Sequence, residues 1–435
     1  MELDPSPRAG TGVRPPPAHR ATTAHLQAAY PFMAEGGLGD GGAYVGRDLL
    51  GGSFCFDPWD LYRRGVLTGP NVVVVGQIGR GKSTFVKSFL WREQVFGRQA
   101  WIVDPKGEYG ALAAACRATP LRIFPGGHLR LNPLDLPRAS AGRPAAEEAA
   151  RRRSDLVCSL SAASLGRNLT PPERAAVDVA VRRVSAETMA PTLPAVVWRL
   201  FQPSPDSARD LRTDVKGLAA DGRQVALELR RLVEGDLAGM FDGPTSPGVD
   251  LAAPVVVLDL SDLYSSPALG VLMTCATAWL HAALTEAGGV HRLVVVDEAW
   301  AILHSVAIAR WLRAGFKLSR ALGVANVAVV HRLSDLTGAG AEGSEQQRLA
   351  EGLLADAETR VVFGQPPSEV SAGRELLGLT STEADLLPRL PRGVALWKVG
   401  RRSFLVQHRL AGSERRLVDT DAAMREWAPS PGERP

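Results

Sequence analysis

The fold is decided by residues 71–84, which read Asn71-Val72-Val73-Val74-Val75-Gly76-Gln77-Ile78-Gly79-Arg80-Gly81-Lys82-Ser83-Thr84. The run of valines is typical of a strand that is buried on both faces. The residues after it satisfy the phosphate-loop pattern Gly-x4-Gly-Lys-[Ser/Thr], and a helix is expected from Thr84 to Phe96. Strand, glycine-rich loop and helix therefore occur in the order that a nucleotide-binding α/β fold requires. The alternative is a glycine-rich turn that binds nothing, and it does not require this order.

Each residue type in this loop has an expected task. The three glycines allow the backbone to point its N–H groups inward at a phosphate chain, and the positive end of the following helix attracts the same anion. Lys82 is expected to contact the β- and γ-phosphates, and Ser83 to bind Mg2+. The expected nucleotide-contacting residues of the loop are Gly76, Gln77, Gly79, Arg80, Gly81, Lys82, Ser83 and Thr84.

A second apolar strand ends in two adjacent carboxylates, Asp297 and Glu298, after the run Leu293 to Val296. This is the second acidic motif expected of a phosphate-loop ATPase. Asp297 is expected to hold Mg2+ through water, and Glu298 to polarise the attacking water. A glutamate after the aspartate favours a hydrolysing motor over a nucleoside kinase, because a kinase needs no base that activates water.

Polar residues also follow two other expected strands. Asp104, Lys106 and Glu108 come after the strand Gln99 to Val103, where ligands gather in parallel α/β sheets, so all three are expected at a site. Asp104 and Glu108 are expected to contact the nucleotide. The alternative for this cluster is a helix cap with a solvated turn. His331 comes after the strand Val324 to Val330, where it is either a sensor of the γ-phosphate or a cap of the next turn.

Composition bounds the class of protein. With 435 residues, 45% of them hydrophobic and 22% charged, the chain can bury the core of a large α/β domain with an insertion. The formal charge of +4 comes from scattered arginines, so it permits nucleic-acid contact without indicating it. The four cysteines lie far apart and match neither a metal site nor a disulfide scaffold, which favours a reducing cytosol.

Two segments of the sequence indicate where in the cell the protein is expected. Residues Met1 to Ala21 are rich in proline and arginine and lack the apolar core of a signal peptide. Residues Leu263 to Thr285 are uncharged, but they include several hydroxyl side chains and their strongest apolar residues recur with a helical period. We therefore expect a buried core helix there rather than a membrane span.

Changes in composition and periodicity along the sequence predict that the chain has five parts. They are a flexible N-terminal tail (1–45), the first part of the core (46–136), a helical insertion (137–247), the second part of the core (248–415) and a C-terminal tail (416–435). In the insertion, Thr170 to Glu173 has the chemistry of a helix start, and the arginine clusters at 151–153 and 182–183 are expected to be solvated helix faces. Thr359 to Gln365 predicts an edge strand, and Ala395 to Gln407 a terminal hairpin.

These blocks, in this order, look like the additional-strand ATPases of the HerA, FtsK and type IV secretion group, and most like the VirB/TraC-type secretion ATPases. The resemblance covers about residues 50–410. It rests on Gly76 to Thr84, Val103 to Tyr109, Leu258 to Ser261, Val295 to Trp300, Lys317 to Arg320, and Leu377 to Leu396. It implies an α/β fold: a RecA-like phosphate-loop NTPase core with a mostly parallel sheet and helices on both faces, interrupted by an all-helical insertion.

The resemblance also implies a homo-oligomer, a hexameric ring whose sites lie between subunits and receive an arginine from the neighbour. Such an arginine stabilises charge on the transferring phosphoryl group. By position, Arg320 is the first candidate for this catalytic role and Arg374 the second. The family usually places glutamine where this chain has His331.

The predicted function is an ATP-hydrolysing motor, with ATP and Mg2+ as cofactors, that moves DNA or protein in conjugative transfer or type IV secretion. The first alternative is a translocase that pumps duplex DNA, and the second is an ATP-binding scaffold with little turnover. DNA and membrane-bound channel proteins are the partners that the resemblance implies. The expected location is the cytoplasm, peripheral to the inner face of the membrane.

Overall fold

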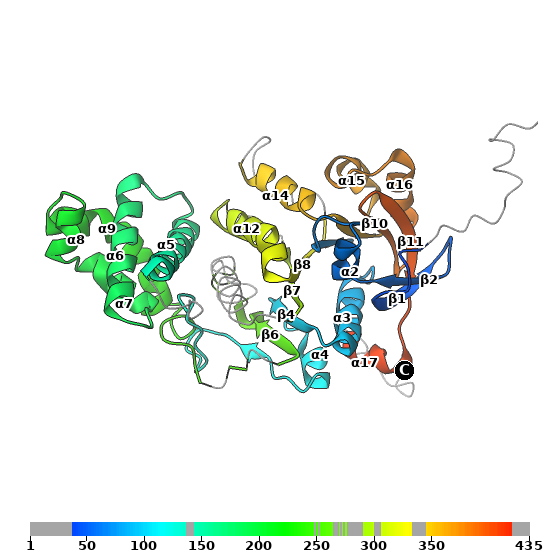
Figure 1. Cartoon of the computed structure of the whole chain (residues 1–435), viewed down its shortest axis with the longest axis horizontal. Helices are drawn as coiled ribbons and strands as arrows, with labels where there is room; N and C mark the ends of the chain where they lie inside the picture. Colours follow the sequence, from blue (N-terminus) through cyan, green and yellow to red (C-terminus); the bar gives the residue numbers. More distant parts are fainter. Residues whose placement is uncertain are drawn as a thin grey trace, which may run out of the picture.

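The strands of the molecule form one sheet of 11 strands within the part of the chain that the structure describes, in the order β2-β1-β11-β10-β9-β3-β8-β7-β4-β6-β5 (Figure 1). The structure is a computed structural model. It describes residues 37–135, 143–247, 249–250, 253–263, 290–299, 306–332 and 345–419, with the single residues 269, 272 and 275.

One half of the sheet, from β9 to β5, is parallel. Its strands are β3 (Val72–Val75), β4 (Gln99–Asp104), β5 (Leu121–Arg122), β6 (Val255–Asp259), β7 (Arg292–Val296), β8 (Val324–Val330) and β9 (Thr359–Phe363). Because parallel strands all end at the same edge of a sheet, the loops after them meet there. The predicted strands at 72–75, 99–103, 293–296 and 324–330 are confirmed, and so is the mostly parallel sheet.

Strand β3 shows why its sequence is a continuous apolar run. Val73 and Val75 belong to the core on one face of the sheet, together with Phe316 of α12 (Val306–Leu322). Val72 and Val74 belong to the core on the other face, together with residues of α3 (Lys82–Glu93). The valines of β3 are at most 2% exposed, so each face of the strand must be apolar.

The other half of the sheet is antiparallel and comprises β1 (Ala43–Asp48), β2 (Ser53–Phe56), β10 (Val394–Val399) and β11 (Arg402–His408). The predicted hairpin is β10 and β11. The prediction of an edge strand at 359–365 was wrong, because β9 lies between β3 and β10. The ring of Trp397 lies 5.1 Å from that of Phe56 and 5.0 Å from that of Phe54, so these aromatic residues form core packing.

Gly46 of β1 offers a test of this antiparallel half. A Cβ at Gly46 would lie 2.1 Å from the carbonyl oxygen of Gln407 in β11, whereas a Cβ at Gly52 would meet nothing within 4 Å. We expect Gly46→Ala to lower the free energy of unfolding by roughly 1–3 kcal/mol, because the strands must move apart. Gly52→Ala is the matched control and should leave the thermal unfolding midpoint unchanged. Equal midpoints for the two variants would contradict the pairing of β1 with β11.

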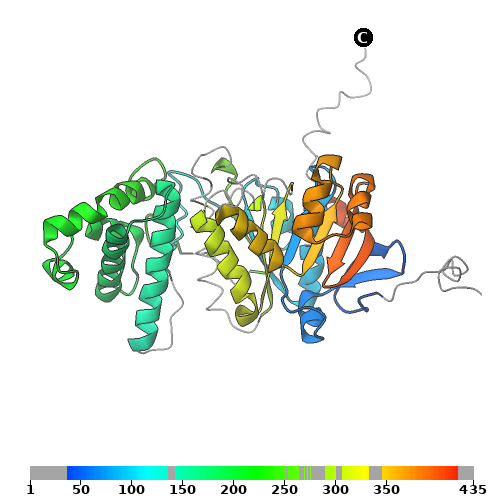
Figure 2. The same cartoon turned by 90° about the horizontal axis from the view of Figure 1, so that it is seen from above.

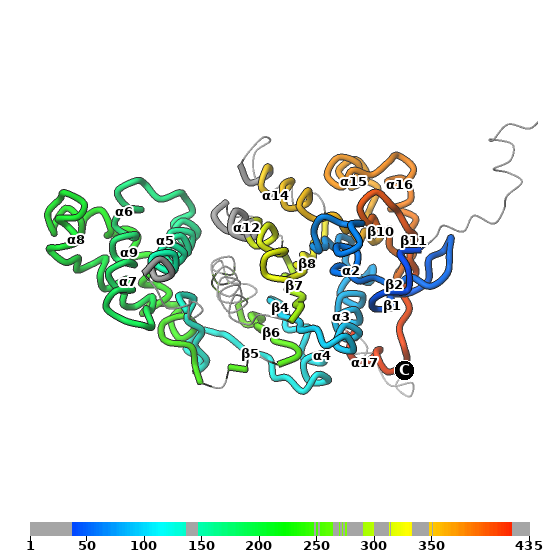
Figure 3. Tube along the Cα trace, in the orientation of Figure 1, coloured from blue at the N-terminus to red at the C-terminus, as the bar shows by residue number. Residues whose placement is uncertain are grey.

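A group of helices lies between β5 and β6 in the sequence and at one end of the molecule in space (Figures 1 and 2). Its helices are α5 (Arg143–Leu165), α6 (Pro171–Glu187), α7 (Leu193–Phe201), α8 (Pro205–Asp210) and α9 (Val215–Val233). The Cα trace in Figure 3 shows the chain leaving for this group near β5 and returning near β6. Helix α12 packs against α5, so the group contacts the core.

The helix start predicted at Thr170 is confirmed, since Thr170 and Glu173 form a capping box at the beginning of α6. The predicted solvated arginines are also borne out at three positions. Arg152, Arg182 and Arg183 pair with acids four residues away on their own helices, at N–O distances of 3.1, 2.8 and 2.8 Å. Charges neutralised in this way do not form a basic patch for nucleic acid.

The remaining elements connect the strands or cover the sheet. They include α2 (Pro58–Arg63), α4 (Gly110–Ala115), α14 (Glu345–Ala355), α15 (Val370–Leu377), α16 (Ser381–Leu386) and α17 (Arg415–Val418). No helix within the described ranges has the length and apolar character needed to cross a bilayer. Most of the helix predicted at 263–285 and most of the two predicted tails, residues 1–36 and 420–435, lie outside the described residues. The described part of the expected N-terminal tail includes the start of β1 at Ala43.

Candidate active site

The glycine-rich loop joins the end of β3 to the start of α3. Gly79 and Gly81 have φ angles of +78° and +114°, which L side chains rarely adopt. Gly76 is needed for a different reason, because a Cβ there would lie 2.5 Å from the Cβ of Phe363 in β9. The N–H of Gln77 donates to the carbonyl of Gly364 at 3.1 Å, so the residue that follows β9, a neighbour of β3 in the sheet, also fixes the loop.

Lys82 is the first residue of α3, and only 4% of it is exposed. Its ammonium donates to two carbonyl oxygens of its own loop, those of Gly76 at 2.5 Å and Gln77 at 3.3 Å. Burial lowers the pKa of Lys82 to about 8, against the opposing effect of Asp297 and Glu298. The lysine is therefore a buried cation that is folded back over the loop. Ser83 follows it at the beginning of the same helix.

Asp297 follows β7 at the same edge of the sheet and is 5% exposed. Its Oδ2 accepts a hydrogen bond from the hydroxyl of Tyr109 at 3.1 Å, and its Oδ1 accepts one from the backbone N–H of Glu298 at 2.9 Å. Burial and the neighbouring Glu298 raise the pKa of Asp297 to about 6. The carboxylate is thus held in one orientation, as a metal ligand requires.

Glu298 has a strained backbone, and its carboxylate contacts two basic side chains through one oxygen. Its φ angle is +52°, in the left-handed region that a non-glycine residue adopts at a cost of about 1–3 kcal/mol. The side chain is 1% exposed. Its Oε1 lies 2.5 Å from Nε2 of His331 and forms an ion pair with the ammonium of Lys106. Glu298 is therefore withdrawn from water in this structure.

Asp104 and Glu108 lie in the loop after β4, and they differ in accessibility. Asp104 is 1% exposed, and its carboxylate accepts the backbone N–H groups of Lys106 at 3.1 Å and Tyr109 at 2.9 Å. Burial raises its pKa. Glu108 is 29% exposed and lies 3.5 Å from the ammonium of the fully buried Lys87. In this structure the carboxylate of Asp104 holds the backbone of the loop that leads to α4, whose first turn has no side-chain cap.

Tyr109 was not among the predicted site residues, although it lies in the block from Val103 to Tyr109, whereas Lys106 was expected at the site without an assigned role. Tyr109 is completely buried, so its hydroxyl has no acceptor in water and is held by Asp297. A lysine between two acidic residues at the end of a strand was the available signal for Lys106. Which carboxylate it would pair with depends on contacts between distant parts of the chain.

Arg320 does not join these residues. It lies in the last turn of α12, is exposed, and Gly323 separates that helix from the first residue of β8. The loop after β3 lies at the opposite ends of the strands, and the 7 residues of β8 span roughly 20 Å. Arg374, the second candidate, lies in α15 and is exposed as well.

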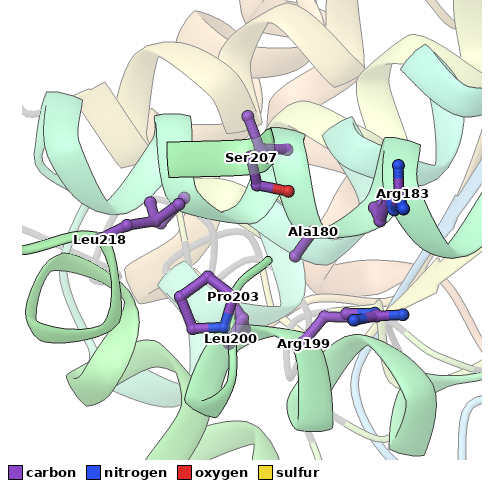
Figure 4. A pocket seen from close by; sticks show the side chains of 9 residues that line it. Ala180, Arg183, Arg199, Leu200, Pro203, Ser207 and Leu218 are labelled. Carbon is purple, nitrogen blue, oxygen red and sulfur yellow. The ribbon is translucent and has the colours of Figure 1, made fainter. Parts of the chain in front are cut away.

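Two cavities lie away from the loop after β3. Figure 4 shows one of them among Arg199, Pro203 and Ser207 of the helical group, and its volume of about 10 Å3 is too small for a nucleotide. The other, of about 410 Å3, is lined by residues that include Trp91 and Arg117. Trp91 lies near the end of α3, which begins at Lys82, so this cavity is remote from the loop.

No family model and no curated protein sequence matches this chain. Solved structures match its fold. VirB4 of Thermoanaerobacter pseudethanolicus superposes with a TM-score of 0.70 at 22% identity, over 87% of this chain and 100% of that chain. The unbound bacterial conjugative coupling protein TrwB gives a TM-score of 0.54 at 15% identity, over 78% of this chain and 85% of that chain.

TrwB in complex with the ATP analogue ADPNP gives a TM-score of 0.52 at 15% identity, again over 78% of this chain and 85% of that chain. At these identities the likeness bears on the fold. The predicted RecA-like phosphate-loop core is confirmed: this chain has the fold of VirB4 and TrwB.

Proposed function

We propose that this chain is an ATP-hydrolysing motor of the type IV secretion and conjugative-transfer kind, which couples hydrolysis of Mg-ATP to the movement of DNA or protein. The observation that carries the proposal is the arrangement of Lys82, Asp297 and Glu298 at one edge of a sheet with the fold of VirB4 and TrwB. TrwB itself has been solved with an ATP analogue and with ADP and Mg2+.

The donor set of the site fits a magnesium nucleotide. The ammonium of Lys82 donates to loop carbonyls, and the β- and γ-phosphates would replace these acceptors. The hydroxyl of Ser83 would bind Mg2+, and Asp297, oriented by Tyr109, would hold its water ligands. Bound Mg2+ would neutralise charge on the phosphates. Gly76, Gln77, Gly79, Arg80, Gly81, Thr84, Asp104 and Glu108 complete the proposed nucleotide-contacting set.

Glu298 is the proposed base for hydrolysis. As a base, Glu298 accepts a hydrogen bond from the attacking water and orients that water in line with the bond between the β- and γ-phosphates that is to be broken. Because its carboxylate is bonded to Lys106 and His331, it must leave these partners first. The contact with His331 supports a sensor role for this histidine, since a residue that touches the base can respond to what the base contacts.

A neighbouring copy of the chain would complete the site. Arg320 is exposed and lies too far along the sheet to reach the phosphates of its own subunit, so it would act only across an interface. This arrangement requires a homo-oligomer, and a hexameric ring is our proposal. We retain the division into a tail (1–45), two core parts (46–136 and 248–415), a helical insertion (137–247) and a C-terminal tail (416–435). The proposed location is the cytoplasm, at the inner face of the membrane.

The test is the rate of ATP hydrolysis with Mg2+, measured alone and with single-stranded or double-stranded DNA. We expect turnover that requires Mg2+ and exceeds that of Glu298→Gln. Stimulation by DNA that weakens between 50 and 200 mM salt would indicate DNA as the cargo. Stimulation by duplex alone would favour the alternative translocase that pumps duplex DNA.

The scaffold alternative makes the opposite prediction for turnover. A wild-type preparation that binds ATP with Mg2+ but hydrolyses it no faster than Glu298→Gln would overturn the motor and support the scaffold. Because the expected site is shared between copies, the assay is run over a range of protein concentrations with the oligomeric state measured in parallel.

A further inference from the structure

Lys106 occupies a position that the proposed hydrolysis does not yet explain. It follows β4, yet its ammonium contacts Glu298, which follows the adjacent strand β7, and His331, which follows β8, the next strand beyond β7. The distance from Nζ of Lys106 to Nε2 of His331 is 3.3 Å. In the sheet order β3-β8-β7-β4, the side chain therefore reaches back toward the phosphate loop after β3.

The backbone of Lys106 is fixed while its side chain has room to move. Its N–H donates to the carboxylate of Asp104, and Gly107 makes the next turn with a φ angle of +70°. The side chain is 27% exposed, whereas Glu298 is 1% exposed. Lys106 can thus change partner without rearrangement of the loop, and its charge also acts on the pKa of Lys82.

A triphosphate bound to the loop would bring its γ-phosphate to the ammonium of Lys106, where it would compete with the carboxylate of Glu298. The β-phosphate is expected within the loop itself, and the γ-phosphate extends beyond it toward the ends of β8 and β7. A phosphate oxygen carries more charge than a carboxylate oxygen and accepts strong hydrogen bonds from an ammonium. A diphosphate would end before it reaches this position.

We propose that Lys106 is a ligand of the γ-phosphate, which it binds in exchange for the carboxylate of Glu298. The inference rests on the proposed function, because it takes the phosphate loop as the nucleotide site. It assigns to Lys106 the discrimination between triphosphate and diphosphate. It also makes release of Glu298 conditional on the group that Glu298 must act on, so a site that holds ADP keeps its base covered.

The experiment measures the dissociation constants of ADP and of a non-hydrolysable ATP analogue, both with Mg2+, by calorimetry. The variants are Lys106→Gln, Glu298→Gln and the double variant, with Lys106→Met as a second substitution. We expect Lys106→Gln to weaken binding of the analogue about tenfold or more, because a hydrogen bond to a charged group is lost. Binding of ADP should change by less than about twofold.

Measurements in the Glu298→Gln background distinguish two roles of Lys106, that of a ligand of the γ-phosphate and that of a counter-ion of Glu298. If Lys106 served only to neutralise Glu298, its substitution would cost nothing once that charge is gone. We expect the loss for the analogue to persist in the double variant. Loss of the effect there, or an equal loss for ADP, overturns the inference and leaves the nucleotide site standing. A wild-type protein that binds neither nucleotide overturns the proposed function together with the inference.

Discussion

Glu298→Gln is expected to bind ATP and hydrolyse it at least about 100-fold more slowly than the wild type, because general bases contribute 10²–10⁴-fold to rates. The amide has nearly the shape of the carboxylate and can still accept a hydrogen bond, so the fold and the left-handed backbone at φ +52° should persist. What is lost is the charge that orients and polarises the attacking water. Phosphate release at saturating Mg-ATP measures the effect on kcat.

Glu351→Gln is the control for this prediction, since Glu351 is an exposed residue of α14 that lies outside the proposed site. It should retain wild-type kcat and KM. The assignment of Glu298 fails if Glu298→Gln keeps more than a tenth of the wild-type kcat, or if it loses nucleotide affinity in proportion to its rate. The second outcome would indicate a binding role rather than a role in the chemical step.

The phosphate loop could be predicted from the sequence because every signal for it is contiguous. The valines of β3, the glycines with positive φ and the start of α3 follow one another within one short stretch. The same holds for the capping box at Thr170, whose two partners are three residues apart. Local patterns of this kind require no knowledge of what the rest of the chain does.

The order of strands could not be predicted in the same way. Strand β9 has no free edge, since it pairs with β3 on one side and with β10 on the other. Its own five residues do not reveal which strands pair with it, because those partners are distant in sequence. Strands β1 and β2 were not predicted, because the burial against β10 and β11 that stabilises them as strands depends on residues distant in the sequence.

The contacts that cover Glu298 also could not be predicted from the sequence. The motif after β7 predicts that Glu298 is present but not that Lys106 and His331 cover it. These three residues come from the ends of three strands, and only the sheet order brings them together. Arg320 illustrates the converse, since its place in the chain made it a candidate while the sheet separates it from the phosphates of its own subunit. Its proposed task therefore depends on a second copy.

Lys82→Ala is the second change for which we expect a large effect, namely a loss of nucleotide affinity of about 100-fold or more. Removal of one partner from a buried charged contact costs about 2–5 kcal/mol, which corresponds to this factor. Lys82 is 4% exposed, so Lys82→Met is measured beside it to keep the volume of the side chain. Neither variant should lower the thermal unfolding midpoint greatly, because each removes a buried charge that burial itself disfavours.

Stability and affinity should therefore change independently in these variants, and this separation is the reason for measuring both. Lys216→Ala removes an exposed lysine from α9 and should change neither quantity. Titration with ADP and with a non-hydrolysable ATP analogue, each with Mg2+, gives the affinities. If Lys82→Met binds both nucleotides as tightly as the wild type, the loop from Gly76 to Lys82 does not hold the phosphates. The geometry of Asp297 and Glu298 would then serve some other chemistry.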